Sequence, residues 1–100
     1  MTTQFRYGST AWGVVQVRNP STRAPVAADG GTVTAKIIGE DAQQIGSTIN
    51  LTAFGSFTGA YQWEVDVNTP DFIPGTVYRV YIEYAVSTVL NKDWDVFQVT

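Results

Sequence analysis

The side chains of this sequence that could do chemistry are carboxylates, because it has nine Asp and Glu residues but no His and no Cys. Histidine is the usual general base near neutral pH and the commonest metal ligand. Without cysteine, disulfides and thiolate chemistry are excluded as well. The sequence also has no Gly-x-Ser-x-Gly motif and no phosphate-binding glycine loop. We therefore predict no catalytic residue, no cofactor and no enzymatic activity.

Acidic side chains recur at three places, namely Glu64 with Asp66, Asp71, and Asp93 with Asp95. Asp71 and the Asp93–Asp95 pair could converge at one end of a folded domain and supply the carboxylate oxygens that calcium prefers. Alternate acids along a strand are, however, typical of any solvated sheet face, and the Asp-rich spacing of an EF-hand loop is absent. We therefore predict no metal site.

Three aromatic residues are candidates for binding. Trp12, Tyr81 and Trp94 each lie out of phase with the apolar residues of their segment or beside a loop. Exposed Trp and Tyr side chains anchor protein interfaces and also form sugar-binding platforms. We predict that these three residues are interface anchors. The alternative is that Trp12 and Trp94 cover the two ends of the hydrophobic core.

The elements that position these residues are predicted to be β-strands. Apolar residues alternate with polar ones in segments 32–38, 61–67 and 76–86, and more weakly in 11–17, 45–52 and 94–99. Turn-forming Gly, Pro, Asn and Asp separate the segments, and no segment has the spacing of an amphipathic helix. The pattern predicts one all-β domain over residues 1–100, a single antiparallel β-sandwich of about seven strands.

The alternation also predicts which side chains face the core. The expected inner faces are Val33, Ala35 and Ile37; Tyr61, Trp63, Val65 and Val67; and Tyr78, Val80, Ile82, Tyr84 and Val86. In segment 11–17 the register stays open, since Trp12 and Val14 lie opposite Val15 and Val17. Residues 18–31 are predicted to cross between the two sheets, held at Pro25-Val26, with a binding loop as the alternative.

The segment Ile73-Pro74-Gly75-Thr76-Val77-Tyr78 resembles the E–F corner of fibronectin type III and related immunoglobulin-like domains. The resemblance implies an immunoglobulin-like sandwich in which Pro74 and Gly75 form the turn. It also implies that the Tyr78 hydroxyl bonds to the backbone a few residues upstream. The segments 59–63 and 95–99 are similar to strands of bacterial and phage sandwich modules. The lack of a tryptophan in segment 32–38 departs from fibronectin type III.

The whole chain resembles small phage virion proteins, such as capsid decoration proteins and head or tail accessory subunits. It is compact, lacks Cys and His, and is rich in Thr, Val, Gly and Tyr. This resemblance implies a non-enzymatic virion subunit that docks on capsid or tail proteins, as a homo-oligomer or in many copies on a lattice. Since the first residues lack the pattern of a signal peptide, we expect synthesis in the host cytoplasm.

The composition limits the classes of partner that this chain is expected to bind. Charged residues make up only 15% of the chain, which favours a surface that partly faces protein, since ~25% is usual for soluble domains. A net charge of −3 and six scattered Lys and Arg residues argue against nucleic acid. No apolar run is long enough to cross a membrane. The alternative function is a carbohydrate-binding or adhesion module that uses exposed aromatics.

Overall fold

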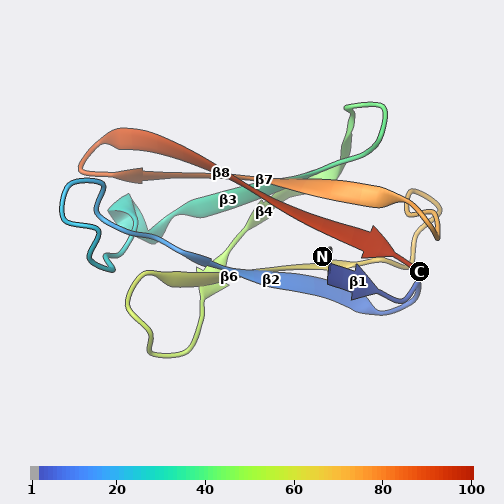
Figure 1. The fold of residues 1–100 in the computed structure, drawn as a ribbon, viewed down its shortest axis with the longest axis horizontal. Coiled ribbons are helices and arrows are strands. Elements are labelled where there is room, and N and C mark those ends of the chain that lie inside the picture. The colour runs from blue at the N-terminus through green and yellow to red at the C-terminus, as the bar shows by residue number, and fades with distance from the viewer. Residues whose placement is uncertain (1–2) are drawn as a thin grey trace.

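The computed structural model describes residues 3–100 as two β-sheets that pack face to face (Figure 1). The larger sheet has the order β1-β8-β7-β3-β4, and the smaller sheet has the order β2-β6-β5. The strands of the larger sheet are Thr3–Phe5 (β1), Val89–Val99 (β8), Val77–Val86 (β7), Val33–Ile38 (β3) and Gln44–Asn50 (β4). Those of the smaller sheet are Thr10–Gln16 (β2), Ala60–Asp66 (β6) and Thr52–Ala53 (β5). The predicted all-β class is confirmed.

One strand pair departs from the predicted antiparallel arrangement. β1 pairs with β8 in parallel, whereas the other ladders among residues 3–100 are antiparallel. The chain leaves β1 after Phe5 and reaches the smaller sheet at Thr10. Because β1 and β2 belong to different sheets, β1 does not have to form a hairpin with the next strand and can run alongside β8. Within the described residues, no helix has the length and hydropathy needed to span a bilayer.

The predicted inner faces of the three strongest strands are confirmed. The core is built from side chains such as Val33, Ile37, Trp63, Val80 and Ile82, each at most 1% exposed, while Val65 and Tyr84 pack partly buried against it. The open register of β2 is resolved, because Ala11 and Val15 are buried while Trp12 and Val14 face outward. Alternation along each strand therefore separates the core from two outer sheet faces.

Segment 45–52, predicted as one strand, is two short strands in different sheets. Leu51 is buried, and its backbone N–H donates to the Val33 carbonyl at 2.9 Å. Just beyond it, Thr52 and Ala53 pair with β6 of the smaller sheet. The chain thus changes sheets at Leu51, which the alternating pattern alone does not indicate.

The segment between β2 and β3 crosses from the smaller to the larger sheet, as predicted. Arg18 and Pro25 form an isolated bridge, and the Val26 N–H donates to the Val17 carbonyl at 3.2 Å. Further on, the Ala28 N–H donates to the Tyr61 hydroxyl at 3.1 Å, which ties the segment to the core. A single 3₁₀ turn, Asp29–Gly31, then leads to β3.

The β7–β8 hairpin turns through Ser87 and Thr88, whose φ values of 51° and 65° place both residues in the left-handed region. Two-residue hairpins of this kind usually carry Asn or Gly, and neither is present here. The Asp29 carboxylate compensates from the crossover segment: it accepts the Ser87 N–H at 3.1 Å and the Thr88 N–H at 2.7 Å. As a result β8 begins at Val89, well before the predicted start at 94.

At Gly13, β2 leaves no room for a side chain against the core. A Cβ atom at this position would lie 2.5 Å from Trp63 Nε1 and 2.8 Å from Asp95 Oδ2. Trp63 is 1% exposed, and its Nε1 has no hydrogen-bond partner among residues 3–100. Glycine is therefore required here for lack of space, because the indole of Trp63 fills the volume of a side chain.

We predict that Gly13→Ala lowers the free energy of unfolding by about 1–3 kcal/mol, the usual cost of overpacking a core. Urea denaturation followed by tryptophan fluorescence measures it. In a Trp63→Phe background the cost should fall, because the ring edge that a Cβ would meet is gone. An equal cost in both backgrounds would rule out the Trp63 contact as its cause.

We predict that Asp29→Ala destabilises the domain by about 1–3 kcal/mol, because it leaves two turn N–H groups without their charged acceptor. Thermal unfolding followed by circular dichroism tests this. Asp71→Ala is the matched control at an exposed acid, where a change within ~0.5 kcal/mol is expected. If the two variants unfold alike, Asp29 does not stabilise the hairpin.

Candidate functional site

Two of the three predicted anchors meet on the outer face of the larger sheet. Tyr81 on β7 lies directly opposite Trp94 on β8. Their ring centroids are 4.7 Å apart, and the ring planes are inclined by 49°. Trp94 is 55% exposed, and Tyr81 is partly buried beneath it and its neighbours. An aromatic pair of this kind is a large, rigid surface that is open to a partner.

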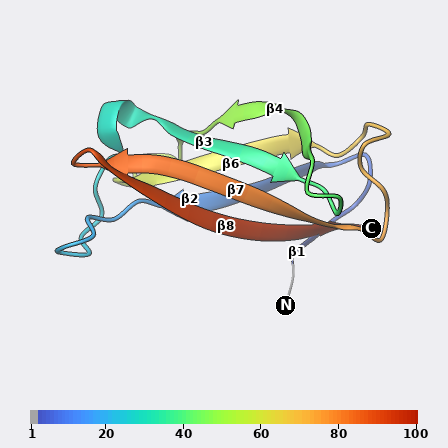
Figure 2. The same ribbon diagram turned by 90° about the horizontal axis from the view of Figure 1, so that it is seen from above.

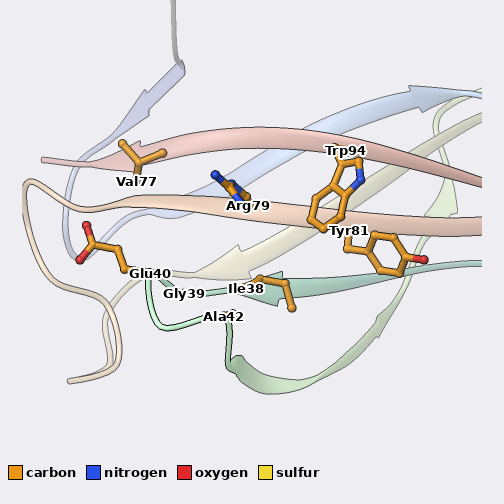
Figure 3. A pocket seen from close by; sticks show the side chains of 8 residues that line it. All are labelled: Ile38, Gly39, Glu40, Ala42, Val77, Arg79, Tyr81 and Trp94. Atoms are coloured by element: carbon orange, nitrogen blue, oxygen red, sulfur yellow. The ribbon is translucent and has the colours of Figure 1, made fainter.

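This pair borders an open groove of about 680 Å³ (Figure 3). The groove is lined by Ile38, Gly39, Glu40, Ala42, Val77, Arg79, Tyr81 and Trp94. Val96 lies opposite Arg79 and extends the apolar surface along β8. We use the name Trp94 face for the outward-facing residues of β3, β7 and β8 that surround the pair and the groove: Lys36, Ile38, Val77, Arg79, Tyr81, Glu83, Lys92, Trp94 and Val96.

Cations flank the aromatic pair. Lys36 lies opposite Tyr81 on the β3 side. On the β8 side the Lys92 ammonium lies 5.9 Å from the centroid of the Tyr81 ring, within the range of a cation–π contact. Hydrogen bonding to Tyr81 raises the pKa of Lys92, and a lysine is charged at neutral pH even without such a shift. The Trp94 face therefore combines exposed rings with fixed positive charge.

The third predicted anchor, Trp12, lies on the other side of the molecule. It is 50% exposed and lies opposite Glu64 on the outer face of the smaller sheet. Val14 beside it is also exposed, and Thr10 donates to Asp66 Oδ1 at 2.9 Å. We call this surface the Trp12 face: Thr10, Trp12, Val14, Gln16, Gln62, Glu64 and Asp66.

The alternative that Trp12 and Trp94 cover the ends of the core is wrong. Both lie within their strands and both are at least half exposed. Ala11, next to Trp12, and Phe97, three residues after Trp94, occupy core positions of these strands, so alternation turns the two tryptophans outward.

The acidic residues do not form a metal-binding cluster in the described part of the chain. Among residues 3–100 there is no group of three or more side chains suited to hold a metal ion. Asp71 lies in the loop before β7, whereas Asp93 and Asp95 lie opposite Ile82 and Val80 within the β7–β8 ladder. The calcium alternative thus has no ligand set in this part of the chain.

The corner before β7 has the hydrogen bonds that were predicted for it. The Tyr78 hydroxyl accepts the Ile73 N–H at 2.7 Å and donates to the Asp71 carbonyl at 3.2 Å. Tyr78 itself is 2% exposed. After Pro74 the chain turns at Gly75, whose φ of 92° suits glycine, and the Gly75 N–H donates to the Val99 carbonyl. The corner thus joins the start of β7 to the end of β8.

Comparison with known proteins informs the fold but not the activity. No protein family model and no curated protein matches this chain. The fold is similar to that of a DUF4785 family protein from Legionella pneumophila, with a TM-score of 0.64 and 12% sequence identity. The similarity covers 98% of this chain and 26% of that protein, so this chain spans about a quarter of its length. At this identity the likeness shows the fold alone.

Sequence reasoning missed the aliphatic and charged part of the site. Ile38, Val77, Arg79 and Val96 were not singled out, although Val77 and Val96 are exposed apolar residues. Their signal is the same as that of Tyr81, since each lies out of phase with the inner face of its strand. It could be recognised only with the strand order, because residues from β3, β7 and β8 form one surface.

We predict that Tyr78→Phe costs about 1–3 kcal/mol of unfolding free energy, because the Ile73 N–H loses its acceptor in a partly buried site. Urea denaturation measures the change. Tyr7→Phe removes an exposed hydroxyl of the same type and serves as control, with an expected change within ~0.5 kcal/mol. Equal effects of the two substitutions would refute a stabilising corner.

Proposed function

We propose that this chain is a non-enzymatic module that docks on other proteins through its Trp94 face. The observation that carries the proposal is the exposed Trp94 packed on the partly buried Tyr81 at the edge of an open groove. Exposed Trp and Tyr in a mostly apolar setting are typical hot-spot residues of protein interfaces. Arg79 within the groove adds a residue type that such interfaces favour. With neither His nor Cys in the sequence, the chemical repertoire also favours binding over catalysis.

We further propose that the sandwich is immunoglobulin-like. The neighbours β8-β7-β3-β4 correspond to strands G, F, C and C′ of a variable-type immunoglobulin domain, and β2-β6-β5 correspond to B, E and D. The Tyr78 corner at the start of β7 lies at the start of strand F, as in that fold. The Trp94 face is then the outer face of the C′CFG sheet.

The setting that we propose is a virion, where the chain docks on capsid or tail proteins. A charged fraction of 15% and a docking face on one sheet support a subunit that is surrounded by protein. The virion setting stays a prediction, as does the expected site of synthesis in the host cytoplasm.

Carbohydrate binding is the second candidate, and the same aromatic pair favours it. A sugar ring stacks flat on an aromatic face, and Arg79 and Glu40 beside the rings could bond its hydroxyls. The inclination of 49° between Tyr81 and Trp94 speaks against a flat platform that spans both rings. The groove walls of Ile38 and Val77 are apolar as well, so a protein side chain fits better than a sugar.

We predict that a photo-crosslinking amino acid at position 77 forms a discrete protein adduct in the cells or particles that contain this chain. Val77 lines the groove, so the probe faces the proposed partner. Trp94→Ala should lower the adduct yield at least ~10-fold, the effect of losing one interface hot spot. Mass spectrometry of the adduct measures this.

The control carries the same probe at Phe57, an exposed residue in the loop between β5 and β6 of the smaller sheet. It should give no adduct that depends on Trp94. A glycan array with the wild-type chain and Trp94→Ala tests the second candidate. Trp94-dependent glycan binding without a protein adduct would replace the docking proposal by sugar binding.

A further inference from the structure

The two outer faces of the sandwich carry opposite charge. The Trp94 face holds Lys36, Arg79 and Lys92, half of the six basic residues in the sequence, against the single acid Glu83. Its net charge is positive although that of the whole chain is −3. Two further acids, Glu40 and Asp41, lie in the loop at the end of the groove, and Glu40 lines the groove itself.

The Trp12 face carries the complementary pattern. Its charged members are Glu64 and Asp66, and no Lys or Arg is among its described residues. Trp12 and Val14 both face outward, two positions apart on β2, and Trp94 and Val96 do the same on β8. Each face thus presents an exposed tryptophan and, two residues further on, an exposed valine.

We propose that copies of this chain stack with the Trp94 face of one copy on the Trp12 face of the next. The proposal rests on the Trp94 face being the docking surface, and it names a second copy as the occupant. Charge complementarity selects this arrangement: cations around Tyr81 meet Glu64 and Asp66 of the partner copy, while Trp12 and Trp94 supply apolar contact. Two outer sheet faces can pack at about 10 Å, as stacked sheets do.

Contacts between two identical faces are disfavoured by repulsion between like charges. Two Trp94 faces would bring six cations together, three from each copy, and two Trp12 faces would bring together only acids. The contact therefore joins different surfaces of the two copies.

The two faces lie on opposite sides of the molecule, because the sheets form two layers (Figure 1), and Figure 2 shows the larger sheet in front of the smaller one. Each copy therefore keeps one face free after docking. A contact of this kind continues from copy to copy and ends only when a ring closes.

The test uses light scattering and sedimentation of the purified full chain over a range of concentrations. Wild-type chain should associate beyond the dimer and should dissociate as salt is raised, because exposed charges are screened. Arg79→Glu with Trp94→Ala removes one face, and Glu64→Lys with Trp12→Ala removes the other. Each double variant alone should raise the dissociation constant at least ~10-fold. Circular dichroism verifies that both variants stay folded.

Mixing the two double variants gives the sharpest readout. One keeps only its Trp12 face and the other only its Trp94 face, so the mixture should form a 1:1 heterodimer that grows no further. The charge exchange Arg79→Glu with Glu64→Arg in one chain should restore association, since its faces are complementary again.

A wild-type chain that stays monomeric at every concentration would overturn the stacking. So would a homodimer of either double variant, because like faces would then be in contact. The docking proposal fails separately. It is wrong when the probe at position 77 gives no adduct that depends on Trp94. A monomeric chain that forms a Trp94-dependent adduct with a different protein refutes the stacking but retains the docking proposal.

Discussion

Phe97 is the side chain through which both sheets and the loop before β7 are held together. Its ring centroid lies 6.0 Å from that of Phe5 on β1, 5.7 Å from that of Trp63 on β6, and 5.6 Å from that of Tyr78 on β7. Phe72, in the loop, lies 6.5 Å away. Aromatic contacts of this kind contribute beyond their buried area. Without cysteines to cross-link the chain, core packing links the two layers, and the Phe97–Trp63 contact of this cluster is part of it.

The position of Phe97 also determines what the larger sheet shows to its surroundings. Side chains alternate strictly along a strand, so burial of Phe97 turns Val96 and Trp94 outward. Tyr78 pairs with Phe97 across the ladder and is buried too, which turns Tyr81 to the same outer face as Trp94. A shift of one residue along β8 would turn Phe97 and Val99 outward and the charged Lys92 inward, so the core fixes this register. The composition of the proposed docking surface is therefore a consequence of how the core packs.

Properties with a local cause could be predicted from the sequence. Alternation identified the inner faces, and the residues around Tyr78 indicated its hydrogen bonds, because both depend on neighbouring positions. Three features could not be predicted, since each depends on a distant partner: the short parallel strand β1, the change of sheet at Leu51, and the hairpin that Asp29 supports across 58 residues. The site was found in part for the same reason. Trp94 and Tyr81 were identified by residue type and phase, while Ile38 joins them only through the strand order.

The edge of the larger sheet is a further reason to expect docking through faces. The Val99 N–H points toward β7 and the Thr100 N–H toward β1, so the even-numbered N–H groups of β8 point away from β7. β1 pairs with β8 only from Phe97 onward, which leaves the earlier part of this edge without a neighbouring strand among residues 3–100. There the Asp93 carboxylate accepts the Trp94 N–H at 2.8 Å, and the Asp95 carboxylate accepts the Val96 N–H at 2.9 Å. A partner strand would have to displace both carboxylates to reach these donors, and charged residues on an edge are a known protection against strand addition. Two of the acids that first suggested a calcium site, Asp93 and Asp95, thus protect the β8 edge against strand addition, which favours docking through the outer face beside it.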